Sequence, residues 1–213
     1  MKTYTYGNDD ALNILIQMVD DHDLSAIEQE VEHIRKLTGA DFRLIAVKVG
    51  SWNNDLSPWE APPVFGNERF GSGAQQTLEY IKTQIIPELS EKLQDPACRL
   101  FIGGYSLAGL FALWSVYQTD IFSGAVAASP SAWFPGFIDY VRKNEIMTQA
   151  VYLSLGDKEE KTRNPVMAQV GNAIRKISDI LSSSGTSTIL EWNQGTHFRD
   201  PDLRTEKGFA WLL

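Results

Sequence analysis

The sequence predicts an α/β fold with a mostly parallel central sheet and helices on both faces. Short apolar runs rich in Val, Ile and Leu alternate with longer helical patterns along the 213 residues. Strands that alternate with helices indicate right-handed βαβ units. Hydrophobic residues make up 43% of the chain and charged residues 22%, which are globular proportions. We expect one domain over residues 1–213.

The first elements follow from local patterns. The apolar run Leu12–Val19 predicts a strand. Ser25, with Glu28 three residues later, is typical of a capping box and predicts the start of a helix that ends before Gly39. Phe42–Val49 predicts the next strand.

A long loop over residues 50–73 follows, and then a helix over 75–93 that Pro87 should kink or break. The later strands are expected at 99–103, 124–128, 151–155 and 187–192, and the later helices at 107–117, 133–143, 165–181 and 203–213.

The charge and cysteine content narrow the function classes. A net charge of -8 disfavours binding to nucleic acid or to an anionic membrane. No apolar stretch approaches the roughly 20 residues that span a bilayer, and Met1–Asp10 lacks the apolar core of a signal peptide. Cys98 is the one cysteine, so no intrachain disulfide is expected. These features predict a cytoplasmic protein, and they leave its oligomeric state open.

The strongest local motif is Gly104-Tyr105-Ser106-Leu107-Ala108-Gly109, which lies between an apolar strand and a helix. A nucleophile elbow needs this arrangement, because the serine occupies a strained turn and its neighbours two positions away must be small. The usual pattern is G-x-S-x-G, and Ala108 departs from it by one methyl group. Ser106 is therefore the predicted nucleophile; a simple helix cap is the alternative.

His197 is the predicted general base. The chain has three histidines, and His22 and His33 lie in an acidic loop and on a helix, where we expect solvated surface positions. His197 follows a strand and Gly195 near the end of the chain. A base that reaches a serine hydroxyl from a loop would lie in such a place.

The acid partner should follow a strand between the serine and the histidine, where it can orient the imidazole. Asp157, Glu159 and Glu160 all fit, and at most one of them is expected to act. Asp139 and Asp120 fit less well, because neither directly follows a strand.

An oxyanion hole needs two backbone N–H donors. Leu107 should supply one, directly after the nucleophile. Trp52 is favoured for the other, in the loop after the strand that ends at Val49, with Ser51 and Asn53 as alternatives. Trp59 in the same loop and Tyr105 beside the serine are the predicted substrate-binding residues.

No cofactor or metal is expected. The scattered histidines and the one cysteine have no metal-ligand spacing, and no glycine-rich phosphate loop with a following lysine is present.

These motifs together resemble the putative-esterase (esterase D-like) family of the α/β-hydrolase superfamily. The resemblance rests on the serine motif at 104–109, the loop at 52–59, the acidic segment at 156–159 and Gly195-Thr196-His197. It implies an α/β-hydrolase fold with a Ser–His–acid triad and a small-molecule ester substrate. It selects Glu159 as the acid, three residues after the strand-ending glycine, and the short chain leaves little room for a lid.

The predicted function is therefore a serine hydrolase of carboxylic esters that works through an acyl-enzyme. A thioesterase, acyltransferase or peptidase on the same fold is the first alternative, since a fold does not fix a substrate. A non-catalytic binding module with the same fold is the second.

Overall fold

The computed structural model describes residues 1–213, which form a seven-stranded sheet with the strand order β1-β3-β2-β4-β5-β6-β7. Neighbouring strands run parallel except for β1 and β3, which are antiparallel. The strands are β1 (Lys2–Gly7), β2 (Asn13–Val19), β3 (Arg43–Lys48), β4 (Arg99–Tyr105), β5 (Gly124–Ala128), β6 (Ala150–Gly156) and β7 (Ser187–Asn193).

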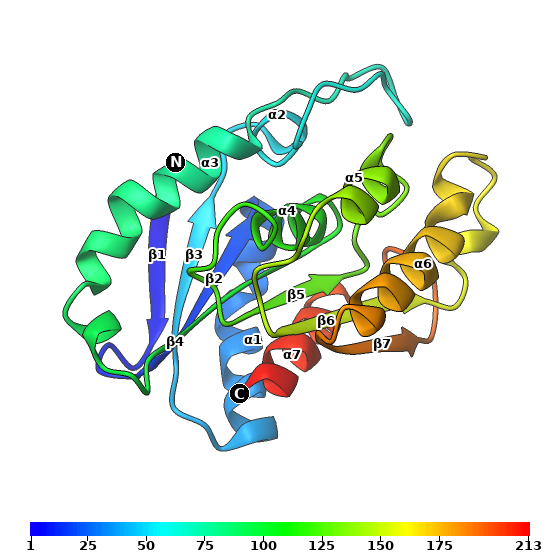
Figure 1. The fold of residues 1–213 in the computed structure, drawn as a ribbon. Helices are drawn as coiled ribbons and strands as arrows, with labels where there is room; N and C mark the ends of the chain where they lie inside the picture. The colour runs from blue at the N-terminus through cyan, green and yellow to red at the C-terminus, as the bar shows by residue number, and fades with distance from the viewer.

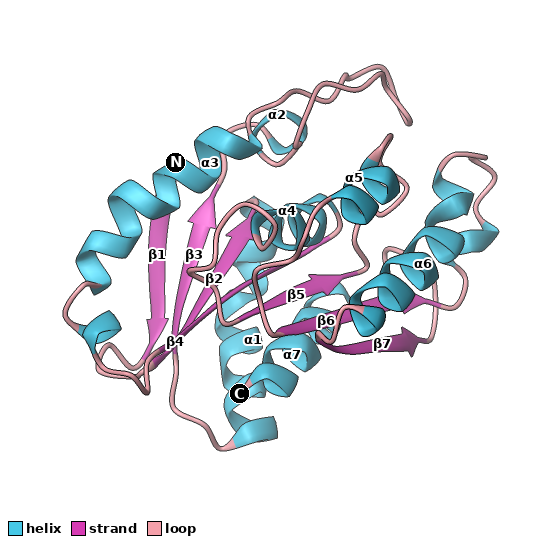
Figure 2. Cartoon of the chain, viewed as in Figure 1, coloured by secondary structure: helices cyan, strands magenta, loops and turns pink.

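Helices cover both faces of this sheet (Figures 1 and 2). The helices are α1 (Asp21–Thr38), α2 (Trp52–Asp55), α3 (Ala74–Tyr80), α4 (Leu107–Ser115), α5 (Phe137–Lys143), α6 (Val170–Ser183) and α7 (Pro201–Leu212). The fold class predicted from the sequence is therefore confirmed. No helix has the length and apolar character needed to cross a bilayer.

The core consists of two apolar layers, because successive strand side chains point to opposite faces of a sheet. Ile14 and Ile16 of β2 belong to a layer of 40 buried residues that also contains α4 and the buried face of α6. Leu15 and Val19 belong to a layer of 14 residues with α1 and α7. The alternation within β2 thus joins both layers through one strand.

Several local predictions need correction. The loop expected over residues 50–73 contains the short helix α2, and the helix expected over 133–143 begins only at Phe137. Residues 2–7 form an exposed antiparallel edge strand, β1, which the sequence analysis missed because this strand has no apolar run. Helix α1 begins at Asp21 and not at Ser25, since the carboxylates of Asp20 and Asp23 accept each other's backbone N–H groups. The segment predicted as helix 75–93 is regular only to Tyr80 and continues as π and 3-10 turns around Pro87.

Two glycines let α7 lie close to the sheet. A Cβ on Gly208 would stand 2.3 Å from Cγ1 of Val126, and a Cβ on Gly103 would stand 2.5 Å from Cζ of Phe209. Such separations are far below van der Waals contact. Helix α7 can therefore approach β4 and β5 only because these positions lack side chains, and this approach brings its first turns under the carboxyl ends of the strands.

We expect Gly208→Ala to lower the free energy of unfolding by about 1–3 kcal/mol through overpacking, although alanine normally favours a helix. Chemical denaturation measures this loss. The matched control is the double variant Gly208→Ala/Val126→Ala, in which the clashing Val126 methyl groups are absent. Its loss of unfolding free energy should be smaller than the sum of the losses in the two single variants. A Gly208→Ala protein as stable as the wild type would contradict this packing.

Candidate active site

Ser106 lies at the turn between β4 and α4 with backbone angles of φ 59° and ψ -118°. A positive φ is strained for a residue with a side chain and is typical of functional turns. The turn is fixed on both sides, since the Ser106 N–H donates to the carbonyl of Ala128 and its own carbonyl accepts from Leu110 and Ser131. The predicted elbow conformation is therefore present.

Small side chains allow this turn to be so tight. A Cβ on Gly104 would stand 2.6 Å from Cβ of Ala108, and a Cβ on Gly109 would stand 2.9 Å from the carbonyl oxygen of Gly104. The single methyl group of Ala108 is accommodated because Gly104, directly opposite, has none. This explains how the turn forms with alanine where the usual motif has glycine.

The structure brings Ser106, His197 and Glu159 into one chain of hydrogen bonds. His197 Nε2 lies 3.0 Å from Ser106 Oγ, and His197 Nδ1 lies 2.7 Å from Glu159 Oε2. An ionised carboxylate only accepts, so Nδ1 carries the proton in the neutral ring. Nε2 is then free to accept the serine proton.

The three neighbouring acids have three different partners. Glu159 is buried and contacts His197. Asp157 accepts the backbone N–H of Gly195 at 2.7 Å, which holds the turn before the histidine. Glu160 forms a two-pronged ion pair with Arg175 on the surface. Only Glu159 is placed to orient the imidazole.

The other oxygen of Glu159, Oε1, accepts from three donors. These are the Ser129 hydroxyl at 2.8 Å, the Gly156 backbone N–H at 2.7 Å and Nη1 of Arg204 at 2.7 Å. Burial raises the pKa of Glu159. The hydrogen bond and charge of the His197 ring lower it, as do the bonds from the Gly156 N–H and the Ser129 hydroxyl. The lowering effects are larger in sum, so the pKa lies below its ordinary value. Glu159 is therefore held as a carboxylate.

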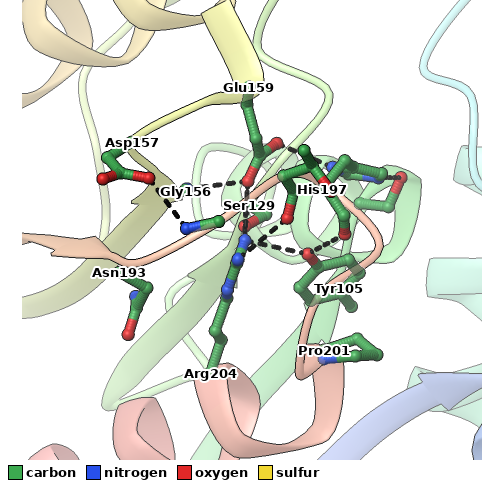
Figure 3. Close-up of polar contacts among 12 residues, drawn as sticks. Tyr105, Ser129, Gly156, Asp157, Glu159, Asn193, His197, Pro201 and Arg204 are labelled. Atoms are coloured by element: carbon green, nitrogen blue, oxygen red, sulfur yellow. Dashed lines mark hydrogen bonds and ion pairs between the residues drawn. The ribbon is translucent and has the colours of Figure 1, made fainter.

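Arg204, from the first turn of α7, is a residue that the sequence analysis missed. Its side chain is 1% exposed, and Figure 3 shows it reaching toward Glu159 and Tyr105. Besides Glu159, Nη1 lies 2.8 Å from Ser129 Oγ and 3.1 Å from the Tyr105 hydroxyl, while Nη2 donates to the Thr196 carbonyl at 2.9 Å. One guanidinium thus connects the acid to the ends of β4 and β5 and to the loop that carries His197.

Tyr105 and Ser129 complete this network. The Tyr105 hydroxyl donates to the backbone carbonyl of His197 at 2.5 Å. Burial raises the pKa of Tyr105 to about 12, so the hydroxyl keeps its proton at neutral pH. Ser129 has a second strained conformation, with φ 42°, and its hydroxyl bonds to both Glu159 and Arg204. No sequence motif predicts the contacts that the Tyr105 and Ser129 hydroxyl groups make.

The predicted oxyanion donors both begin helices. Leu107 opens α4, and Trp52 opens α2; the first N–H groups of a helix have no partner within the helix. Of the two alternatives, Ser51 already donates its N–H to Asp55 Oδ2 at 2.9 Å. Asp55 also binds the Gly50 N–H and so holds the turn that precedes Trp52.

The two predicted substrate-binding residues do not line the cavity beside His197. The Trp59 indole N–H donates to the carbonyl of Pro135, and its ring packs among Phe134, Phe137 and Tyr140. The Tyr105 hydroxyl faces the backbone of the histidine loop. A contact of either residue with substrate stays a prediction. The cavity is lined instead by Trp133, Phe198, Lys158 and Lys161, among others.

The two remaining histidines are exposed, as expected, although His33 Nδ1 also pairs with the buried Glu206 at 3.1 Å. His22 gathers with Asp20 and Asp23 within 4.8 Å. The two carboxylates of that group cap α1, which accounts for their position.

The arrangement of strands, elbow and histidine loop is that of the α/β-hydrolase fold. The siderophore hydrolase EstA from Aspergillus nidulans superposes with a TM-score of 0.73 at 19% identity, over 94% of this chain and 82% of that one. An IroE-like serine hydrolase from Shewanella oneidensis gives 0.74 at 15% identity, over 99% and 74%. The enterobactin esterase Fes from Shigella flexneri gives 0.66 at 14%, over 99% and 54%.

These likenesses establish the fold of this chain, and they agree with the family resemblance drawn from the sequence. No protein-family model and no curated protein sequence matches the chain.

We expect Arg204→Met to lower the free energy of unfolding by about 3–5 kcal/mol, because it leaves the buried Glu159 carboxylate without its cation. The control is Arg175→Met, which breaks the exposed pair with Glu160 and should cost at most about 1 kcal/mol. Urea denaturation compares the two. Equal losses of unfolding free energy in the two variants would show that Arg204 does not stabilise the buried Glu159 carboxylate.

The free energy of unfolding should depend on Glu159 at acid pH. Since its folded pKa lies below the ordinary 4.5, Glu159 contributes stability above that value and loses it as the pH falls through the folded pKa. The wild type should therefore destabilise more steeply than Glu159→Gln below about pH 4.5. Denaturation at a series of pH values tests this, and parallel curves would refute it.

Proposed function

We propose that this protein is a serine hydrolase of small carboxylic esters, with Ser106 as nucleophile, His197 as general base and Glu159 as the acid that orients the imidazole. The observation that carries the proposal is the hydrogen-bond chain from Ser106 Oγ through His197 to Glu159, at 3.0 Å and 2.7 Å. The strained serine turn and the serine hydrolase and esterases among the structural neighbours support it.

The proposed reaction has two steps. His197 Nε2 takes the hydroxyl proton as Ser106 Oγ attacks the ester carbonyl, and the N–H groups of Leu107 and Trp52 stabilise the oxyanion. The ester C–O bond breaks, the proton passes to the leaving alcohol, and the acyl group stays on Ser106. Water, deprotonated by His197, then releases the acid. Tyr105 and Arg204 hold the histidine loop at its carbonyls throughout.

Labelling with a fluorophosphonate probe tests the activated serine. We expect one adduct, mapped to Ser106 by peptide mass, which disappears in Ser106→Ala and falls by several orders of magnitude in His197→Ala, since these groups act as a unit. Both variants should stay folded by circular dichroism. A folded wild-type protein that takes no adduct would favour a non-catalytic binding module.

Hydrolysis of 4-nitrophenyl butyrate and of the matching thioester identifies the bond that is cleaved. We expect faster turnover of the oxygen ester, with Ser106→Ala at the uncatalysed background. A clear preference for the thioester would favour a thioesterase with the same machinery.

A further inference from the structure

A cavity of about 280 Å³ lies beside the His197 imidazole and includes Glu159 and Thr196 in its lining. Its apolar lining residues are Trp133, Met167, Val170 and Phe198. The Phe198 ring is 88% exposed although it packs edge-on against His197. Ligand cavities are lined mainly by hydrophobic and aromatic side chains, and the exposed Phe198 ring is available for such a contact.

Two lysines, Lys158 and Lys161, also line this cavity. Both are exposed, and neither belongs to an ion pair within 4.0 Å. The lining of one cavity thus carries two unpaired ammonium groups, in a chain whose net charge is -8.

The nearby acids already have other partners. Both oxygens of Glu160 bind Arg175, although the charge of Lys161 also helps to lower the pKa of Glu160 after the larger effect of Arg175. Glu159 is balanced by Arg204, and Asp157 binds the Gly195 N–H. The bond to the Gly195 N–H does not neutralise Asp157, but neither lysine pairs with that carboxylate, so both ammonium groups are available to an anion in the cavity.

The proposed mechanism indicates whether this cavity would bind the acyl half or the alcohol half of an ester. In acyl transfer by a serine and a histidine, Nε2 delivers the proton to the leaving oxygen. The leaving alcohol must therefore lie against the imidazole. His197 lines the cavity, whereas Ser106 and the predicted oxyanion donors do not. The cavity is therefore reached from the histidine side of the ester bond, which is the side from which the alcohol leaves.

We propose that this cavity binds the alcohol half of the ester and that Lys158 and Lys161 bind an anion, such as a carboxylate, on that half; the inference rests on the function proposed above. The apolar lining residues, Trp133 and Phe198 among them, suit a single aromatic ring or an apolar body of similar size. Esters formed on the hydroxyl group of a hydroxy acid, such as a hydroxybenzoate with a free carboxylate, have this chemistry. Hydrolysis would release the hydroxy acid with the proton from His197 on its hydroxyl oxygen.

Two acetate esters of equal size test the charge: 4-acetoxybenzoate, with a carboxylate, and 4-acetoxybenzamide, which is neutral. The quantity to compare is the ratio of their kcat/KM values, because differences in intrinsic reactivity cancel between variants. We expect Lys158→Gln/Lys161→Gln to lower this ratio about tenfold, a few-fold for each exposed charge pair. Lys143→Gln, an exposed lysine at the end of α5, is the matched control and should leave the ratio unchanged.

Ionic strength gives a second readout without any mutation. Raising the salt from about 0.05 M to about 0.5 M should lower the wild-type ratio several-fold through screening, while the double variant should respond little. A ratio that is the same in the wild type and the double variant, and insensitive to salt, would overturn the proposal.

Binding to the Ser106→Ala protein separates this inference from the proposed function. Calorimetry should give tighter binding of 4-acetoxybenzoate than of the benzamide, and this difference should vanish when both lysines are also replaced. If Ser106 takes no acyl group but the difference persists, the esterase function fails and the anion site stands. Equal binding of the two compounds would exclude the anion site.

Discussion

The buried ion pair between Glu159 and Arg204 is the interaction on which the site depends. Two charges with almost no exposure are tolerable only when they are paired and well hydrogen-bonded; of these two side chains, the Nε atom of Arg204 alone lacks a partner. Here Arg204 and its partners join the ends of β4 and β5, the turn after β6 and the loop before α7. The buried guanidinium therefore holds the His197 loop, together with Tyr105 and Asp157. Helix α7 can deliver that group because Gly208 lets the helix approach the sheet.

This pairing has a consequence for the proposed mechanism. The charge of Glu159 is already balanced by Arg204 while the imidazole is neutral. Glu159 would then act mainly by fixing the tautomer and direction of His197, and less by attracting the proton. The strained backbones of Ser106 and Ser129, which cost on the order of 1–3 kcal/mol each, are held in the same way, by hydrogen bonds that converge from several strands.

The sequence could predict what depends on local pattern. Ser106 stands in a motif whose small residues have a steric purpose, and His197 follows a late strand and comes after the serine in chain order. The choice among the acids was different. Their position after a strand between the serine and the histidine left Asp157, Glu159 and Glu160 open. The family resemblance selected Glu159, the acid that contacts His197 in the structure.

Arg204 and Ser129 could not be found in this way, because their importance comes from contacts across 45 and 30 residues of chain. Strand β1 had a weaker signal, the alternating Thr and Tyr residues that favour strands. Trp59 packs in an aromatic cluster, and aromatic content alone does not separate such a cluster from the wall of a pocket, so its contact with substrate stays a prediction.

Trapping the acyl-enzyme tests the central claim most directly. Rapid mixing with a 4-nitrophenyl ester, quenching in acid and peptide mass mapping would locate the acyl group. The account predicts a burst of nitrophenol with the acyl group on Ser106, and the burst and the adduct should both be lost in His197→Ala. Steady hydrolysis with no adduct, or an acyl group on another residue, would contradict it.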